Sequence, residues 1–304
     1  RASNTLCGRT PADIEATYSP DWEALAVKSN ATCRQVMDRL TRQYDGYRFT
    51  KDEEFTSMYN PFSVLSALQK RSYGNYWFAS GTPTFLVEML QKTDFDLREM
   101  EGIEVNEASL SDDRADINNP IPMIYQSGYL TIKDYDERFR MYTLGFPNEE
   151  VKYGFLNFVS PFYTPIAQTD TSFYIGKFIR ELESGDVDAF LTRLRCFFAG
   201  IPYDLNDRTE RHYQTVFYLV FQLMGQFTET EVRSARGRAD AVVKTPDYIY
   251  VFEFKLNDSA EAALRQIDEK GYLLPYQADG RKVVKVGVDF EKEERNIGKS
   301  VIGG

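Results

Sequence analysis

The sequence predicts an α/β protein, α+β overall, built in two parts: a mainly helical region over residues 1–200 and a three-layer α/β domain over residues 201–304. In the first part, Pro or Asn repeatedly precedes an apolar run with helical spacing. In the second part, three strand-like runs are followed by a helical pattern and a further strand, which is typical of a sheet covered by helices. The break at Ile201-Pro202 marks the expected boundary.

The helices of the first part are predicted from their starts, where a capping side chain and a following proline suit the free backbone groups of a first turn. The expected starts are Thr10-Pro11, Ser29-Asn30, Asn60-Pro61, Thr82-Pro83 and Phe146-Pro147-Asn148. Residues 126–132 and 141–144 predict a β-hairpin between the last two helices. A helix, a hairpin and a second helix in this order predict a winged-helix-like unit. Two amphipathic helices are expected further on, around residues 178–182 and 187–198.

The second part begins with a long helix, expected over residues 208–225. The elements expected after it are strands near 229–235, 238–244 and 248–256, a helix over 259–272 and a strand over 283–288. This αβββαβ order predicts a mixed sheet with helices on both faces. Gly298-Lys299-Ser300 looks like the end of a phosphate-binding loop, but Glu293 stands where that loop needs glycine. We therefore expect a solvated tail there, and no ATP site.

Composition excludes several kinds of active site. His212 is the only histidine, which excludes paired-histidine metal centres and any Ser-His-Asp triad that does not use it. We expect His212 to be a surface residue or a minor polar contact. The three cysteines form no CxxC pair, which favours a reducing, cytoplasmic compartment. No apolar run is long enough for a transmembrane helix, so no membrane partner is expected.

The formal net charge of −10 disfavours a general nucleic-acid-binding surface. The charge is uneven, however: residues 205–304 contain 15 basic and 16 acidic residues, so the acidic excess lies in the first two thirds of the chain. The acidic character of residues 1–200 favours contact with protein there, and the near-neutral second part remains compatible with a polyanionic substrate.

Three ionisable residues converge on one point of the expected sheet. Glu253 and Lys255 occupy positions i and i+2 of a strand rich in β-branched and aromatic residues, so both side chains project from the same face. Asp240 heads the preceding strand, and a hairpin turn at Thr245-Pro246-Asp247 would bring it beside Glu253. Burial of such charges costs several kcal/mol unless they pair or bind an ion.

Two interpretations of this group are open. A salt bridge from Lys255 to Asp240 or Glu253 at a sheet edge would be purely structural. Alternatively, two carboxylates and a lysine suit a hard divalent cation, Mg²⁺ or Mn²⁺, and a water. In that case Asp240, Glu253 and the backbone carbonyl of Phe254 would ligate the ion, and Lys255 would orient the water and stabilise charge on a phosphate.

The pattern Asp240, then Glu253-x-Lys255, on the second and third strands of an αβββαβ core resembles the PD-(D/E)XK nuclease superfamily. The resemblance implies a restriction-endonuclease-like fold for residues 201–304 and hydrolysis of phosphodiester bonds.

Further positions extend the resemblance. Glu210 looks like the helix glutamate of several branches, which would hold a second metal ion or its water. Gln266, followed by Lys270 and Tyr272, looks like the polar motif of the next helix and would position a water or a phosphate. As exposed residues on ordinary helices, Glu210 and Gln266 would instead be a favourable first-turn charge and a solvated amide.

The segment 234–240 fits the branch of this superfamily found at the C-terminus of AAA-ATPase-like proteins, many of them bacterial. In it, Arg236 and Arg238 flank Gly237 and would contact the backbone phosphates of a nucleic acid. Upstream, 44–49, 59–62 and 146–151 resemble the region that follows the ATPase core in those proteins. No phosphate-binding loop matches, so the resemblance implies a chain without the ATPase core and a first region that adjoins that core or a protein partner.

The sequence thus predicts a metal-dependent nuclease acting on nucleic acid, with DNA favoured. The alternative is a non-catalytic interaction or regulatory module that uses the nuclease fold as a scaffold. The intact motif favours the enzyme, and the acidic surface favours the module. The aromatic clusters of the first region, such as 76–78, are expected to be core rather than base-stacking platforms.

Overall fold

The computed structural model describes residues 10–51, 57–80, 84, 86, 89–90, 95–110, 119–165, 167, 170–201, 210–232, 240–256, 258–291, 293–294 and 296–303. The chain divides into two compact units, Arg1–Phe155 and Leu156–Gly304, which we call the N-terminal and C-terminal units. Within the described residues, no helix combines the length and apolar character that crossing a membrane requires.

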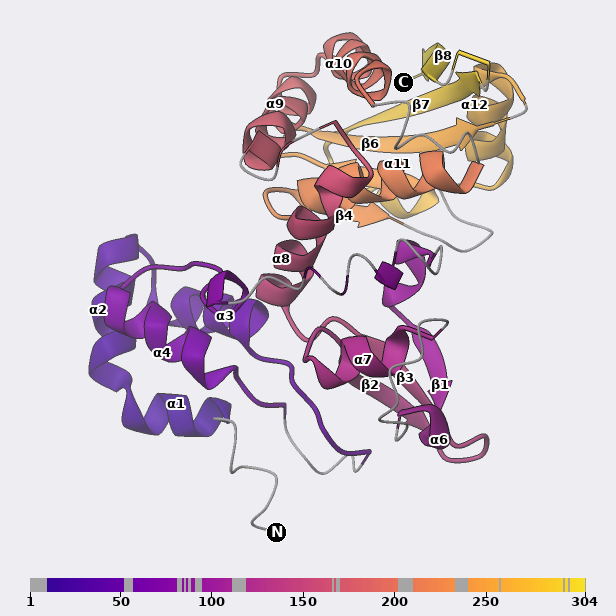
Figure 1. Cartoon of the computed structure of the whole chain (residues 1–304). Helices are drawn as coiled ribbons and strands as arrows, with labels where there is room; N and C mark the ends of the chain where they lie inside the picture. The colour runs from indigo at the N-terminus through magenta and orange to yellow at the C-terminus, as the bar shows by residue number, and fades with distance from the viewer. Residues whose placement is uncertain are drawn as a thin grey trace. The chain divides into compact units, whose positions relative to one another are not determined.

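Four helices with a common core begin the N-terminal unit (Figure 1). They are α1 (Pro11–Thr17), α2 (Ser19–Ser29), α3 (Cys33–Tyr44) and α4 (Pro61–Lys70). Asn60 caps α4 as predicted, because its Oδ1 accepts hydrogen bonds from the amides of Phe62 and Ser63. The start expected at Ser29-Asn30 is displaced: Asn30 ends α2, and α3 begins after Thr32, which forms a capping box with Gln35.

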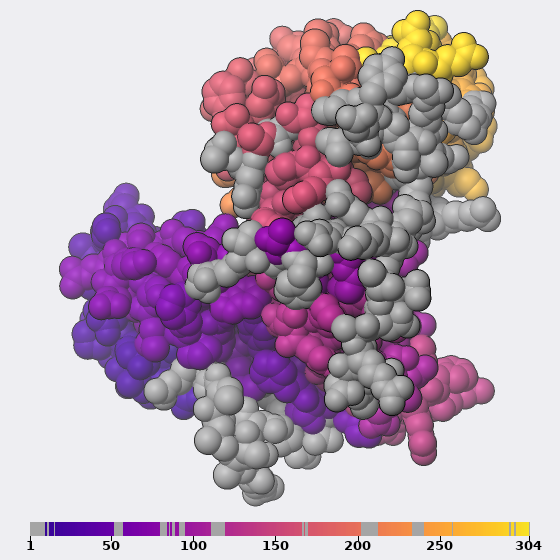
Figure 2. Space-filling view, in the orientation of Figure 1, coloured from indigo at the N-terminus to yellow at the C-terminus, as the bar shows by residue number. Residues whose placement is uncertain are grey.

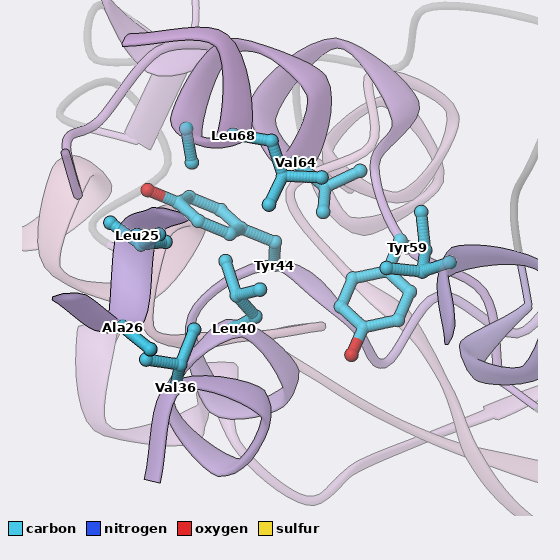
Figure 3. Close-up of a cluster of buried hydrophobic side chains, with 10 residues drawn as sticks. Leu25, Ala26, Val36, Leu40, Tyr44, Tyr59, Val64 and Leu68 are labelled. Carbon is cyan, nitrogen blue, oxygen red and sulfur yellow. The ribbon is translucent and has the colours of Figure 1, made fainter. Parts of the chain in front are cut away.

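The apolar faces of these helices meet in a closed cluster (Figure 3). Leu25, Val36, Leu40, Tyr44 and Val64 are all 1% exposed or less. In α3 the buried residues recur at helical spacing, so one side of the helix is fixed in the core while the other side faces solvent.

The remainder of the N-terminal unit contains a small sheet. Its elements are 3-10 helices at Phe78–Ser80 and Leu97–Met100, β1 (Ile103–Asn106), α6 (Glu107–Leu110), α7 (Ile121–Gln126), β2 (Thr131–Asp136) and β3 (Met141–Gly145). The division between the two units falls within α8 (Glu149–Val159). The strands are antiparallel in the order β1-β3-β2. The expected order of helix, hairpin and helix is present as α7, β2–β3 and α8, and the winged-helix assignment stays a prediction. The start expected at Thr82-Pro83 lies outside the described residues.

The C-terminal unit is built on one mixed sheet. Its elements are a 3-10 helix at Ser160–Phe162, α9 (Thr171–Glu183), α10 (Val187–Ala199), α11 (Glu210–Met224), β4 (Glu229–Val232), β5 (Ala241–Lys244), β6 (Tyr248–Lys255), α12 (Ala260–Glu269), a 3-10 helix at Leu274–Tyr276, β7 (Lys282–Glu291) and β8 (Asn296–Gly303). The strand order is β4-β5-β6-β7-β8. Only β6 and β7 are parallel, because α12 connects them as a crossover. The predicted αβββαβ core is confirmed.

Helices cover both faces of this sheet, as predicted (Figure 1). On one face, Phe252 and Phe254 of β6 meet Phe221 and Phe217 of α11, with ring centroids 5.1 and 4.1 Å apart. On the other face, the alternate β6 residues pack with α12 through Ile267. Because strand side chains alternate, Glu253 and Lys255 lie on the α12 face.

The division of the chain differs from the boundary expected at 200/201. Helices α9 and α10 belong to the C-terminal unit because they pack on its sheet: the Tyr250 hydroxyl donates to the carbonyl of Leu182 at 2.6 Å, and the rings of Phe190 and Phe252 are 5.5 Å apart. The amphipathic pattern of these helices predicted an apolar face, but not which sheet would bury it.

The solvated tail expected at Gly298-Lys299-Ser300 was wrong. These residues lie in β8, which pairs with β7 at the edge of the sheet. Arg195 of α10 donates to the carbonyl of Gly298 at 2.6 Å and to the Ser300 hydroxyl at 3.3 Å, which ties the strand to its own unit. Figure 2 shows part of β8 in yellow at the surface. The sequence did not predict this strand because its glycine and lysine residues interrupt the apolar alternation, which an edge strand does not require.

Candidate active site

A β-hairpin places the two carboxylates together. The turn closes where the amide of Thr245 donates to the carbonyl of Tyr248 at 2.8 Å, and β5 then pairs with β6 in antiparallel register. At the far end of this ladder, the amide of Phe254 donates to Asp240 Oδ2 at 2.8 Å. The expectation that the hairpin brings Asp240 beside Glu253 is therefore confirmed.

Glu253, Lys255 and Gln266 form a hydrogen-bonded group on the α12 face. Lys255 Nζ lies 3.4 Å from Glu253 Oε1. Gln266 bridges the two: its Oε1 accepts from Lys255 Nζ, and its Nε2 donates to Glu253 Oε1. Nε2 also lies 3.4 Å from the hydroxyl of Tyr272. The amide oxygen accepts from the lysine and the amide nitrogen donates to the carboxyl group, which fixes the position of both side chains.

A glycine lets α12 come close enough for this contact. Gly287 of β7 is the register partner of Glu253. A Cβ added at Gly287 would overlap the carbonyl oxygen of Ala260 and lie 3.0 Å from the amide of Leu264, both in α12. Only glycine permits this separation of helix and sheet, and hence the reach of Gln266.

Glu253 is buried and Asp240 is half-buried. Glu253 is 3% exposed. Burial, together with the negative charge of Asp240, raises the pKa of Glu253 to about 7, and Lys255 partly opposes this shift. Burial likewise raises the pKa of Asp240, against the Phe254 amide and the Lys255 charge. The site therefore binds a proton more readily than two exposed carboxylates would.

Each carboxylate has one oxygen held by the protein and one that is not. Glu253 Oε2 is buried and has no hydrogen-bond partner among the described residues. The second oxygen of Asp240 likewise accepts no hydrogen bond from the described part of the chain, since Oδ2 alone is engaged by Phe254. Two carboxylate oxygens with a neighbouring lysine fit a hard divalent cation. In the described ranges, no group of three or more Asp, Glu, His or Cys side chains is placed to hold one, so further oxygens would come from elsewhere.

Comparison with known proteins identifies a family for the domain that carries this site. The family model described as the PD-(D/E)XK nuclease superfamily matches residues 208–300. Residues 208–300 form a PD-(D/E)XK nuclease superfamily domain. The matched span contains Asp240, Glu253 and Lys255.

Beyond this PD-(D/E)XK domain, one curated relative covers nearly the whole chain. It is an "Uncharacterized protein in vnfD 5′ region" from Azotobacter chroococcum mcd 1, 31% identical over 303 residues. The alignment takes in 97% of this chain, which spans 56% of that protein's length. No solved structure matches the chain.

Three other residues predicted for the PD-(D/E)XK site have side chains outside the part of the chain that the structure describes. Glu210 is the first residue of α11, but its side chain lies outside the described part. Arg236 and Arg238 fall within 233–239, which is also outside it. His212 is not a surface residue, which was one of the two expectations: it is 6% exposed, with its ring 5.8 Å from that of Tyr213.

The sequence reasoning missed Asp289. In the parallel register of β6 and β7, Asp289 is the partner of Lys255, and its Oδ1 is buried. An added Cβ at Gly298 would overlap that oxygen, so the Asp289 carboxylate packs against the backbone of β8. Counting strand register across the crossover would have placed Asp289 beside the motif, since parallel partners share a face.

Proposed function

We propose that the PD-(D/E)XK domain is a metal-dependent phosphodiesterase that hydrolyses nucleic acid, with DNA as the favoured substrate. The observation that carries this proposal is the juxtaposition of two carboxylates, Asp240 and Glu253, with Lys255 beside them. Two carboxylates held this close together repel each other, so their juxtaposition is favourable when a cation lies between them.

In this proposal Asp240 and Glu253 hold Mg²⁺ or Mn²⁺, with the backbone carbonyl of Phe254 as a further oxygen ligand. The ion would supply Lewis acidity, polarising the phosphoryl group and lowering the pKa of water. Lys255 would stabilise negative charge on the phosphate, and its ammonium group would help to orient the attacking water. Gln266 holds Lys255 and Glu253 in place and would position a water or the phosphate.

Three further assignments rest on the sequence motif alone. Glu210 would hold a second metal ion or a water bound to it. Arg236 and Arg238 would contact the backbone phosphates of the nucleic acid.

A cleavage assay tests the proposal. The chain is incubated with Mn²⁺ and a panel of single-stranded, duplex and branched DNA and RNA, and each of Asp240→Asn, Glu253→Gln and Lys255→Ala is assayed alongside it. We expect cleavage by the chain, none in EDTA, and a fall of roughly 10²–10³-fold in each variant, as when a single charge-stabilising group is removed.

The matched control is Glu150→Gln, which changes an equally buried glutamate in the other unit and should leave cleavage unchanged. Equal cleavage by the chain and all three site variants would show that the nuclease activity lies elsewhere or is absent.

The alternative function is a non-catalytic module on a nuclease scaffold, favoured by the net charge of −10. Calorimetric titration with Mn²⁺ separates the two. A nuclease should show binding that Asp240→Asn and Glu253→Gln abolish, whereas a scaffold should show none that depends on them.

We also propose that residues 1–200 adjoin an ATPase core or a protein partner, on the strength of the motifs that resemble AAA-ATPase-like proteins. A cytoplasmic location stays a prediction from the cysteine content. Co-purification of the chain with the separately expressed ATPase segment of a longer parent would test the contact.

A further inference from the structure

The first helices carry a cluster of positive charge that stands out from the rest of this acidic chain. Segments 27–44 and 61–78 contain six basic residues and a single acidic one, Asp38. The basic residues are Lys28, Arg34, Arg39, Arg42, Lys70 and Arg71. All six are exposed, and none forms an ion pair with any residue that the structure describes. Exposed cations without ion-pair partners attract a polyanion even when the net charge is negative.

A groove in the N-terminal unit runs between the end of α2, one face of α3 and the loop after α4. It is lined by Asn30, Gln35, Asp38, Arg39, Arg42 and Tyr73 among others. The guanidinium of Arg39 lies 3.8 Å from the ring centroid of Tyr73, stacked on its face. The groove therefore contains two arginines, and one of them, Arg39, forms a planar stacked pair with Tyr73.

The arginines are fixed by the core behind them. Val36, Leu40 and Tyr44 anchor the buried face of α3 (Figure 3), so Arg39 and Arg42 lie on its exposed side, one turn apart. A rigid helix presents such side chains with little loss of entropy on binding.

The cluster extends beyond the groove along one edge. Lys28 Nζ lies 3.4 Å from the carbonyl oxygen of Lys70, so the ends of α2 and α4 are adjacent. The ammonium of Lys70 is in turn 4.6 Å from the ring centroid of Tyr76. Cations interleaved with aromatic rings are typical of surfaces that follow a single strand of nucleic acid, where phosphates meet the charges and bases stack on the rings.

We propose that this groove binds a strand of nucleic acid, a role that rests on the proposed nuclease function. Arg39 and Arg42 contact backbone phosphates, and the stacked Arg39–Tyr73 pair supports a base. Asp38 disfavours a phosphate beside it and instead accepts from an exocyclic amino group. An acidic polypeptide would use the charges, but it has no use for the planar pair, and this favours nucleic acid as the ligand.

Fluorescence anisotropy with a labelled single-stranded DNA tests the proposal on the full chain. EDTA prevents cleavage, so that binding is measured alone. The variant Arg39→Gln/Arg42→Gln is compared with Arg138→Gln/Lys282→Gln, which removes the same charge from exposed positions outside the groove. We expect the groove variant to bind roughly tenfold more weakly. Each phosphate contact contributes about 0.7 to the slope of log K against log salt, so its slope should be shallower by about 1.4. The control should match the unaltered chain.

The outcomes are separable from those of the nuclease proposal. Glu253→Gln should lose cleavage and keep the binding that depends on Arg39 and Arg42. If the Glu253→Gln protein still cleaves nucleic acid while the groove variant loses binding, only the nuclease proposal fails. The groove proposal is overturned if both double variants weaken binding equally, or if polyglutamate of equal charge competes as well as unlabelled DNA. Circular dichroism verifies that each variant is folded, and Tyr73→Leu, which retains both arginines but removes the ring, should weaken binding severalfold.

Discussion

Glu150 in the N-terminal unit and Glu253 in the C-terminal unit are buried almost equally, at 1% and 3% exposed. In both, Oε1 accepts hydrogen bonds while Oε2 has no partner among the described residues. Burial raises the pKa of both carboxyl groups. By burial and by hydrogen-bond deficit, the two glutamates are alike.

Their charged neighbours distinguish them. Glu150 accepts from the amide of Trp77 at 2.9 Å, and hydrogen bonds from Ser63 and from the main chain lower its pKa against the effect of burial. Glu253 faces a second carboxylate, Asp240, and a lysine. Because its donors are neutral, Glu150 has a structural role: it connects α8 to the Trp77 main chain by hydrogen bonds. A like charge held close to Glu253 is unfavourable without a counter-ion, and this is what indicates a cation site.

The largest effect expected from this difference is on the pH dependence of stability in EDTA. The pKa of Glu253 is raised in the folded state to about 7, from an ordinary value of 4.5. Stability from this group is therefore fully present below about pH 4.5 and is lost as pH rises to 7, because the folded state alone retains the proton in that window. The loss is at most about 3 kcal/mol, at 1.36 kcal/mol per pKa unit.

Hydrogen exchange of the β6 amides between pH 5 and 8, corrected for the intrinsic exchange rate, measures this loss. Glu253→Gln, which cannot titrate, should flatten the profile. Parallel profiles for the two proteins would mean that Glu253 is ionised throughout and that its charge is already compensated.

A smaller effect is expected for the structural carboxylate. Glu150→Ala should lower the free energy of unfolding of the N-terminal unit by about 2 kcal/mol, because it removes a buried acceptor from the Trp77 amide and the Ser63 hydroxyl. Urea unfolding followed by tryptophan fluorescence measures this directly, since the two tryptophans, Trp22 and Trp77, both lie in this unit.

The control for that change is Glu149→Ala, which removes an exposed charge from the adjacent position and should alter stability by less than about 1 kcal/mol. Cleavage and Mn²⁺ binding should be unchanged in both variants. A folded Glu150→Ala protein that no longer bound Mn²⁺ would overturn the distinction between the two glutamates.

The sequence predicted the positions of the two carboxylates, but not the contact that α12 makes with them. Strand alternation and a short hairpin determine where Asp240, Glu253 and Lys255 lie, and both are local properties that a sequence displays. The contact from Gln266 depends on the missing side chain of Gly287, 21 positions further along the chain, and no local pattern reveals how closely a helix approaches a sheet.

The burial of Glu150 could not be predicted from the sequence for a related reason. Glu149 and Glu150 both look like favourable first-turn charges of a helix, and only tertiary packing decides that one of them is enclosed. The assignment of α9 and α10 to the C-terminal sheet is likewise tertiary, because an amphipathic helix specifies an apolar face but not its partner.

The smallest effects expected come from the neutral side chains that hold each glutamate, Gln266 for Glu253 and Ser63 for Glu150. Gln266→Ala and Ser63→Ala each remove hydrogen bonds to a buried carboxylate and should each lower stability by about 1 kcal/mol. Only Gln266→Ala should also weaken Mn²⁺ binding in calorimetry, because Glu253 and Lys255 lose the bridge that positions them. Arg265→Ala, a change at an exposed neighbour on α12, serves as its control. If Gln266→Ala and Ser63→Ala leave Mn²⁺ affinity equally unchanged, the bridge is a packing contact like the one at Glu150, and the cation site would consist of Asp240 and Glu253 without help from α12.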